Sequence, residues 1–380
     1  MGKKRSMLLF PLLAALLLAG CGKEGNGAAG DITENGQELQ GQSAEAFATG
    51  YDGTASASGE ENRTEQQSGT IISENQKKNQ DNESSEPVTI GITLASEEAP
   101  YQTELEKVLR ETAVSQNTEL LVRYAGWSEN AQNNQMEDFI EQQVDAIIAA
   151  PVHSKALLNS LKKAKKAGIP VINLNMKVDS ASTRYITSYV GSSSEEEGTL
   201  MAELARKLMT KGGNIAILEG APGSDPQIYR TQYFMDRIRD YSDMNVIDIR
   251  NARWDRETAY ILAKQILETT PNLNMIYCHD TTMAYGAAQA AEEMGRKKDI
   301  LIIGIGAVDE ESIKAVKDKT LDGIVTQSSR FEGTAAILAA CKAAKGESIR
   351  PWIMNPSEIL TEKNIDDYME PEPEGLETGE

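Results

Sequence analysis

Residues 144–177 decide the fold and read VDAIIAAPVHSKALLNSLKKAKKAGIPVINLNMK. Two short apolar runs, Ala146–Ala149 and Val171–Leu174, predict buried strands, and residues 154–167 between them repeat apolar side chains at helical spacing. Gly168 followed by Pro170 is typical of a helix end that leads into the next strand. The segment therefore predicts a β-α-β unit with parallel strands.

The same alternation continues in both directions along the chain. Upstream, Val88–Leu94 (VTIGITL) and 119–124 (ELLVRY) are predicted strands, and 102–116 and 130–143 are predicted helices. Downstream, four helical segments alternate with further predicted strands at 185–190, 215–218, 246–249, 275–277 and 301–305. Apolar strands separated by helices are typical of parallel sheets with helices on both faces.

The alternating region spans about 280 residues, which is more than one such sheet needs. We therefore predict an α/β fold with two doubly wound parallel-sheet lobes. Because ligands bind beyond the carboxyl ends of the strands in open α/β sheets, facing lobes would share one cleft. A TIM barrel is the structural alternative, which the additional short strand at 185–190 disfavours.

The N-terminus has the features of an export signal. Lys3, Lys4 and Arg5 precede an apolar stretch at 7–18, and residues 18–21 read LAGC. This sequence resembles the lipobox of bacterial lipoproteins. The resemblance implies that 1–21 is a lipoprotein signal peptide, that Cys21 is lipidated, and that the protein is anchored on the outer face of the cell membrane. An ordinary secretory signal with a chance cysteine is the alternative.

Two polar segments hold most of the net charge of −20. Residues 22–86 contain 13 acidic and 4 basic side chains and few large apolar ones, and residues 369–380 contain five acidic side chains. Neither segment offers enough apolar surface to offset the entropy of ordering it. We therefore predict a disordered acidic tether at 22–86 and an acidic disordered tail at 369–380. The acidity argues against nucleic acid as a partner.

The remaining chemistry of the sequence is sparse. Cys278 and Cys341 are predicted to be free buried thiols, although they would pair if the fold brought their Cα atoms within about 7 Å. The histidines are His153 and His279, and no His, Cys or carboxylate cluster has metal-ligand spacing. No phosphate-binding glycine motif lies between a strand and a helix. We therefore predict no metal, no cofactor and no enzymatic activity, since no nucleophile–base pair is apparent.

The chain over 87–365 resembles the ribose- and galactose-type periplasmic sugar-binding proteins, the solute receptors of ABC importers. The resemblance is carried by segments in family order: IGITLASEEAPYQTEL, VDAIIAAPVHSKAL, AKKAGIPVINLNMK, ILEGAPGSDPQIYRTQYF, YCHDTTMAYGAAQAAEEMG and LIIGIGAVDEESIKAVKDKTLDGIVTQ. It implies a type 1 periplasmic-binding fold with three crossovers, near 190–192, 326–329 and 356–358. The N-terminal lobe would comprise 87–190 plus 329–356, and the C-terminal lobe 191–328 plus 357–368.

The resemblance also implies a set of ligand contacts in this cleft. Residue types are retained at Tyr101, Arg230, Trp254, Asp280 and Gln327, whereas Gln102, Asn175-Met176 and Gly306 depart from the family pattern. The predicted ligand-binding residues are Tyr101, Gln102, Asn175, Met176, Arg230, Trp254, Asp280 and Gln327. The departures remove a guanidinium and a carboxylate, so ribose itself is not the expected ligand.

Several of these residues have structural alternatives. Trp254 would serve equally as a surface aromatic at a helix start, Arg230 as a partner of Glu219 or Asp225, and Asp280 as a helix cap. Trp127 follows the second predicted strand, and its alternatives are a position in the cleft or packing in the core or at the rim, of which packing is the favoured interpretation.

The predicted function is capture of a small polar ligand, a sugar or polyol, by a monomer that delivers it to an ABC permease. A receptor of the same fold that signals to a membrane sensor is the alternative. A transcription repressor with the same lobes is excluded, because an export signal stands where a DNA-binding module would.

Overall fold

The computed structural model describes residues 87–373 and 376. The predicted signal peptide at 1–21, its lipidation site Cys21 and the predicted tether at 22–86 lie outside the described residues. Among the residues that are described, no helix is both long and apolar enough to cross a bilayer.

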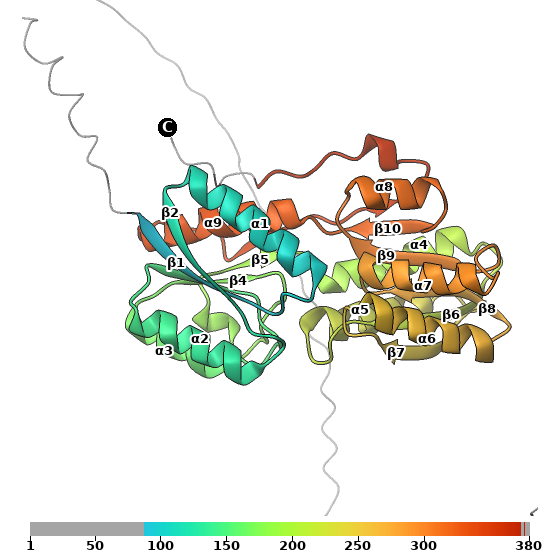
Figure 1. Ribbon diagram of the computed structural model, residues 1–380, viewed down its shortest axis with the longest axis horizontal. Coiled ribbons are helices and arrows are strands. Elements are labelled where there is room, and N and C mark those ends of the chain that lie inside the picture. The colour runs from blue at the N-terminus through green and yellow to red at the C-terminus, as the bar shows by residue number, and fades with distance from the viewer. Residues whose placement is uncertain (1–86, 374–375, 377–380) are drawn as a thin grey trace, which may run out of the picture. The chain divides into compact units, whose positions relative to one another are not determined.

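The described residues build two six-stranded sheets, here called the first and second lobes (Figure 1). The first sheet is entirely parallel and has the order β11-β5-β4-β3-β1-β2. Its strands are β1 (Val88–Leu94), β2 (Thr118–Tyr124), β3 (Ala146–Ala149), β4 (Val171–Leu174), β5 (Ser188–Gly191) and β11 (Trp352–Met354).

The second sheet has the matching order β12-β10-β9-β8-β6-β7 and is parallel except for its edge strand β12. Its strands are β6 (Gly213–Glu219), β7 (Met244–Asn251), β8 (Leu273–Cys278), β9 (Leu301–Gly306), β10 (Gly323–Thr326) and β12 (Ile359–Leu360). The prediction of two doubly wound, largely parallel sheets is confirmed, and the TIM-barrel alternative is excluded.

Helices cover both faces of the first sheet. Helices α1 (Pro100–Ser115) and α9 (Ser329–Ala344) lie on one face, and α2 (Glu129–Glu141) and α3 (Leu158–Ala167) on the other. Successive strand residues point to opposite faces, so Ile148 packs in the α1/α9 cluster while its neighbour Ile147 packs in the α2/α3 cluster. This two-sided burial explains why the strands are apolar without alternation.

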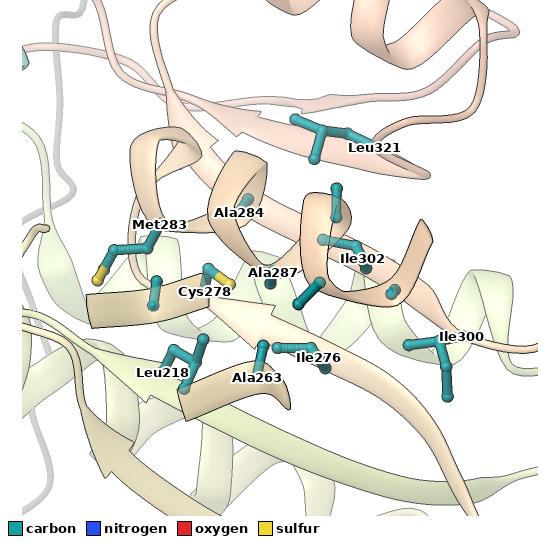
Figure 2. Close-up of a cluster of buried hydrophobic side chains, with 14 of the residues drawn as sticks. Leu218, Ala263, Ile276, Cys278, Met283, Ala284, Ala287, Ile300, Ile302 and Leu321 are labelled. Carbon is teal, nitrogen blue, oxygen red and sulfur yellow. The ribbon is translucent and has the colours of Figure 1, made fainter. Parts of the chain in front are cut away.

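The second lobe repeats this arrangement. Helices α4 (Ser194–Leu208) and α5 (Asp225–Ile238) cover one face, and α6 (Arg256–Thr269), α7 (Thr281–Glu293) and α8 (Glu310–Lys317) the other. Figure 2 shows strand residues Leu218, Ile276 and Ile302 packed against the small side chains Ala263 and Ala287 of α6 and α7. The alanines let these helices lie close to the sheet and bury its apolar face.

The chain passes between the sheets at the three predicted crossovers. Within residues 87–373 these passages connect β5 to α4, β10 to α9, and β11 to β12. Cys278 on β8 and Cys341 on α9 are both buried and unpaired, and they lie in different lobes.

The described part of the C-terminal segment packs on the domain, which corrects the prediction of a disordered tail for residues 369–373 and 376, whereas residues 374–375 and 377–380 lie outside the described residues. The segment first forms η2 (Ile365–Asp367) in the second lobe. Beyond it, Glu370 accepts a hydrogen bond from the hydroxyl of Ser328, which lies at a crossover. Leu376 is 2% exposed and belongs to the α1/α9 cluster of the first lobe. The segment therefore returns from the second lobe to the first (Figure 1).

Two further local differences from the predicted elements have clear causes. The helix predicted at 154–167 begins only at Leu158, because the preceding turn is held by Ser154, whose N–H donates to the Gly223 carbonyl of the second lobe at 3.1 Å. Strands β10, β11 and β12 were not predicted. Two or three residues are too few to show a pattern in β12 and β11, and β10 runs directly into the crossover expected at 326–329.

Candidate ligand-binding cleft

A cleft with a cavity volume of about 180 Å³ lies between the carboxyl ends of the strands of both lobes. All eight predicted ligand-binding residues line it, and the structure thus brings together side chains from both lobes. The first lobe contributes Tyr101, Gln102, Asn175 and Met176, the second contributes Arg230, Trp254 and Asp280, and Gln327 lies at a crossover.

A chain of hydrogen bonds joins the two lobes along the floor of this cleft. Gln102 Nε2 donates to Asn175 Oδ1 at 3.0 Å, and Asn175 Nδ2 donates to Glu332 Oε2 at 3.0 Å. From the second lobe, Arg230 Nη2 donates to Gln327 Oε1 at 3.0 Å, and Gln327 Nε2 donates to Glu332 Oε1 at 3.3 Å. Four of the eight predicted residues therefore hold one another as well as face the cleft.

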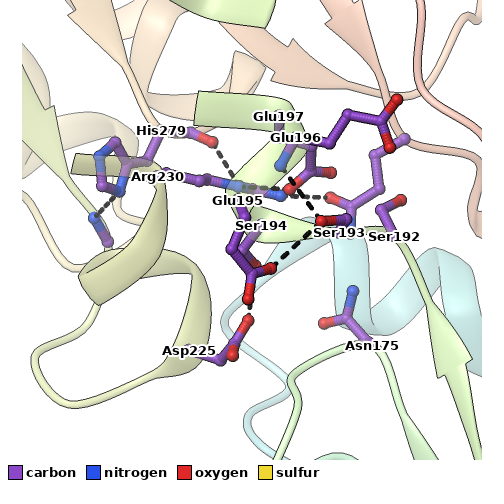
Figure 3. Close-up of polar contacts among 12 residues, drawn as sticks. Asn175, Ser192, Ser193, Ser194, Glu195, Glu196, Glu197, Asp225, Arg230 and His279 are labelled. Carbon is purple, nitrogen blue, oxygen red and sulfur yellow. Dashed lines mark hydrogen bonds and ion pairs between the residues drawn. The ribbon is translucent and has the colours of Figure 1, made fainter. Parts of the chain in front are cut away.

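Arg230 is the centre of this network in the second lobe (Figure 3). Its Nε donates to Glu197 Oε2 at 2.8 Å and its Nη1 to the His279 carbonyl at 2.6 Å. Arg230 and Glu197 are 3% and 1% exposed, so the ion pair is buried. A guanidinium has five N–H donors, and those not used here remain for a ligand.

Arg230 forms a structural ion pair, as its alternative interpretation predicted. The partner is Glu197 and not Glu219 or Asp225. Glu219 instead accepts from Gln227 Nε2 at 3.0 Å and from Thr231 Oγ1 at 2.6 Å. Asp225 Oδ2 accepts from Ser194 Oγ at 2.6 Å (Figure 3), and burial raises the pKa of Asp225 to about 6. Arg230 is thus held by a glutamate that lies 33 residues away in the chain.

Trp254 and Trp127 occupy equivalent turns in the two lobes. Each follows an edge strand, β7 or β2, in a similar local sequence, ARWD at 252–255 and AGWS at 125–128. Both tryptophans have left-handed backbone conformations, with φ of 65° and 59°. Such conformations are costly for large residues and persist where the surrounding structure imposes them. Both rings line the cleft.

The Trp254 ring lies against the backbone of Gly220, where a Cβ atom would approach Trp254 Cζ2 to 1.8 Å. Glycine is therefore required at position 220 for the ring to reach the cleft. On its face the ring meets the guanidinium of Arg230, with Cζ 5.9 Å from the ring centroid. The buried Nε1 of Trp254 has no hydrogen-bond partner. Trp254 is buried and is not the surface aromatic of the alternative interpretation.

Asp280 caps a helix, which was its alternative role, and also lines the cleft, as predicted for a ligand-binding residue. Its Oδ1 accepts from the Met283 N–H at 2.7 Å and so caps α7, while the half-buried carboxyl lines the cleft. Burial raises the pKa of Asp280 to about 6. Beside it, a Cβ atom on Gly306 would lie 2.4 Å from Thr281 Oγ1, so any side chain at 306 must displace Thr281.

The first lobe presents an apolar patch to the cleft. Met176 is buried in a small cluster with Ala95, Ala125 and Val152, against which Trp127 packs. Trp127 also packs against the α6/α7 cluster of the second lobe. Trp127 thus packs between the lobes and also lines the cleft, which combines the two alternatives considered for it.

A comparison of the sequence with models of protein families agrees with the two-lobed geometry of this cleft. Residues 90–348 match the family model described as a periplasmic binding protein domain. The chain belongs to the periplasmic binding protein family.

Relatives of this periplasmic binding protein cover most of its described residues. The ribose import binding protein of Bacillus subtilis (strain 168) is 27% identical over 275 residues, which are 72% of this chain and 88% of the relative. An ABC transporter solute binding protein from Bacillus halodurans C-125, solved with bound myo-inositol, is 29% identical with a TM-score of 0.70 and covers 75% of this chain and 98% of its own. An ABC transporter solute binding protein from Actinobacillus succinogenes 130z, solved with bound D-allose, is 28% identical with a TM-score of 0.69. The match covers 74% of this chain and 100% of that protein's chain.

Glu332 is a cleft-floor residue of this periplasmic binding protein that sequence reasoning missed. It is fully buried and also accepts from Asn355 Nδ2 at 3.1 Å. Burial raises the pKa of Glu332 to about 7, against the opposing effect of its hydrogen bonds with Asn355 and Asn175. In the sequence it reads as an ordinary acidic residue in the first turn of a helix, because its partner Asn175 is 157 residues away.

Trp127 had a usable signal in the sequence. The repeat of alanine, any residue, tryptophan and then a helix-capping Ser128 or Asp255 marks the same turn in both lobes. A search for internal similarity between the lobes would have paired Trp127 with Trp254.

The two histidines of this periplasmic binding protein have structural environments. His279 is buried, its Nδ1 accepts from the Gly220 N–H at 3.4 Å, and its Nε2 lies 3.1 Å from Thr231 Oγ1. Burial and Arg230 lower the pKa of His279 well below its usual range, so the ring is neutral. His153 packs against Gly223 of the second lobe. Among the described residues, no three His, Cys, Asp or Glu side chains are arranged to hold a metal ion.

Proposed function

We propose that this protein is an extracytoplasmic receptor that captures a sugar or polyol between its lobes and delivers it to an ABC importer. The observation that carries the proposal is the convergence of aromatic rings and hydrogen-bonding groups from both lobes on one cleft. A sugar ring offers C–H groups to aromatic faces and hydroxyls to polar groups. The ribose, myo-inositol and D-allose named for the relatives support this ligand class.

The proposed mechanism is closure of the lobes around the ligand. Each lobe holds part of the contact set, so a ligand bound between them stabilises the closed state by its higher affinity for that state. The membrane permease would then recognise the surface that the closed lobes present together. The lobes in this proposal are 87–190 plus 329–356 and 191–328 plus 357–368.

We also propose that the protein is a lipoprotein anchored through Cys21 on the outer face of the cell membrane. The tether at 22–86 would then separate the receptor from the membrane by roughly 45 Å, if it behaves as a flexible coil. Cys21→Ala is expected to abolish lipid labelling and to release the protein from membranes. Retention of the variant on membranes, together with an unlabelled wild type, would exclude the anchor.

Ligand capture is tested by a thermal-shift screen of sugars, polyols, nucleosides and amino acids, followed by isothermal titration of Trp254→Ala with the best ligand. Loss of the ring removes apolar contact in the cleft, and we expect binding to weaken by about 1–3 kcal/mol. Trp254 is a better probe than Arg230, because Arg230→Ala leaves Glu197 buried without its counter-ion and costs about 3–5 kcal/mol of folding stability.

The control is Tyr233→Ala, which removes an exposed aromatic ring of the second lobe that does not line the cleft. It should bind the ligand as the wild type does. Unchanged affinity in Trp254→Ala, with an unchanged melting temperature, would place the binding site elsewhere.

A further inference from the structure

The cleft has an excess of negative charge. Its lining includes the carboxylates of Asp280, Asp309 and Glu311, besides Glu104, which pairs with Lys107 at 3.2 Å, and the one cation among the described lining residues is Arg230. The charge of Arg230 is already balanced by the buried carboxylate of Glu197 at 2.8 Å. A cleft lined by one sign of charge concentrates ligands of the opposite sign.

Asp280 is a carboxylate of the cleft lining that burial destabilises in its charged form. One oxygen accepts the capping hydrogen bond from Met283, and the carboxyl is partly removed from water at the cleft wall. This burial outweighs the favourable influence of Arg230 and holds the pKa of Asp280 above its usual range. Desolvated carboxylates are stabilised when a cation approaches them.

Two of the aromatic rings that line the cleft have no cation beside them in the described part of the chain. Trp254 and Tyr285 already lie near the guanidinium groups of Arg230 and Arg256, at 5.9 and 5.5 Å from the ring centroids. No cation within the described part of the chain lies over the rings of Tyr101 or Trp127. The face of an aromatic ring attracts a positively charged group, most strongly where water is excluded.

The remaining unpaired donors suit neutral oxygen atoms. Trp254 Nε1 is buried without a partner, and Arg230 retains N–H groups beyond those bound to protein. These groups can donate to hydroxyl oxygens of a ligand, whereas Asp280 can only accept. A ligand hydroxyl or a ligand ammonium group can donate to Asp280, and the ammonium group also balances the charge of the carboxylate.

We propose that the cleft is selective for a polyol that carries a protonated amino group, such as an amino sugar or an aminocyclitol. The ammonium group pairs with Asp280, and the hydroxyl groups bind Trp254 Nε1 and the remaining N–H groups of Arg230. This inference rests on the proposed function, because it names the charge class of polyol that the same cleft takes.

The test is isothermal titration at pH 7 with matched compounds: D-glucose, D-glucosamine and N-acetyl-D-glucosamine, the corresponding galactose series, and myo-inositol with an inosamine. In at least one series the amine is expected to bind about tenfold or more tightly than its neutral member, a difference of about 1.4 kcal/mol. The N-acetyl compound, which keeps the nitrogen but loses the charge, is expected to lose this advantage.

Asp280→Asn separates charge from folding, because asparagine caps a helix as well as aspartate does. In this variant we expect the amine and its neutral partner to bind with similar affinity. The matched control is Asp255→Asn, the same change at the cap of α6, where Oδ1 accepts from Thr258 N–H at 2.7 Å outside the cleft lining. It should keep the wild-type ratio.

Two outcomes would overturn the proposal in distinguishable ways. If the neutral member of every binding series matches or exceeds its amine, selectivity for the ammonium group is wrong and the receptor function stands. If no compound of either kind binds, the proposed polyol-receptor function fails and the amine selectivity fails with it.

Discussion

Glu332 shows how one buried carboxyl shapes the floor of the cleft. Three side-chain amide groups donate hydrogen bonds to it. They belong to Asn175 after β4, Gln327 after β10 and Asn355 after β11. These hydrogen bonds favour the ionised form, but the complete burial of the side chain outweighs them and its pKa rises from 4.5 to about 7. The side chain therefore changes its charge in the range of physiological pH.

This pKa predicts the direction of a pH dependence. Between pH 4.5 and 7 the folded state holds the Glu332 proton more tightly than the unfolded chain, so unfolding releases a proton. The contribution to stability is fully present below about pH 4.5 and is lost as pH rises through 7. The loss amounts to about 3 kcal/mol. Urea unfolding at intervals from pH 4.5 to 8 measures it.

Glu332→Gln should reduce this slope, because glutamine does not ionise. The variant is expected to be less stable than the wild type at low pH, since its amide faces the Asn175 donor. Asp225 and Asp280, whose pKa values burial raises to about 6, contribute a slope of the same sign at lower pH, and this slope should remain in the variant. Glu137→Gln, at a side chain that is 43% exposed, is the control and should keep the wild-type slope. An unchanged slope in Glu332→Gln would show that this carboxyl does not titrate there.

At the scale of elements, the C-terminal segment connects the lobes in addition to the three crossovers. Ile365 and Tyr368 pack on the α6/α7 cluster of the second lobe, Glu370 accepts from Ser328 at the start of α9, and Leu376 is buried in the first lobe. This one short segment therefore contacts the hydrophobic cores of both lobes and the start of α9 at the crossover.

Leu376→Ala tests whether this packing stabilises the domain. Loss of a buried leucine side chain should lower the free energy of unfolding by about 2 kcal/mol, as measured by urea denaturation. Met369 in the same segment is 81% exposed, and Met369→Ala should change stability by less than about 0.5 kcal/mol. Equal effects of the two changes would mean that the segment does not dock through Leu376.

At the scale of the whole domain, the lobes meet directly beside the cleft. Ser154 of the first lobe donates its N–H to the carbonyl of Gly223 in the second, and the ring of His153 lies against the same glycine. A Cβ atom on Gly223 would approach His153 Cδ2 to 2.1 Å. The contact forms only when the lobes are together, so it reports on closure.

Gly223→Ala is therefore expected to oppose closure and to weaken ligand binding by about tenfold or more. Small-angle scattering should show less compaction on ligand addition than in the wild type. Gly223 has φ of 80°, so part of any effect on stability is backbone strain.

Gly295→Ala isolates that strain. Gly295 is in the same lobe with φ of 67°, and nothing lies within 4 Å of its Cβ position. It should lose stability but keep ligand affinity, and His153→Ala should restore binding to the Gly223→Ala variant. If both glycine variants bind as the wild type does, closure does not proceed through this contact.

Much of the fold was predictable because hydrophobic periodicity is local. Strands β1, β3 and β4 lie at the residues predicted for them. The eight predicted cleft residues meet because each follows a strand end or lies at a crossover, and parallel strands end at the same edge of a sheet. Strands β10, β11 and β12 were missed because pairing with strands distant in the chain, not a pattern of their own, makes them strands.

The sequence by itself determined the alternation of strands and helices, the two lobes and the candidate cleft, because these follow from local periodicity and chain order. Only the tertiary structure decided that Glu197 holds Arg230, that Glu332 links the amides of both lobes, that Trp127 lies between the lobes and that Leu376 is buried. Each of these depends on residues far apart in the chain and on the free energy of desolvating a side chain, which no local pattern records.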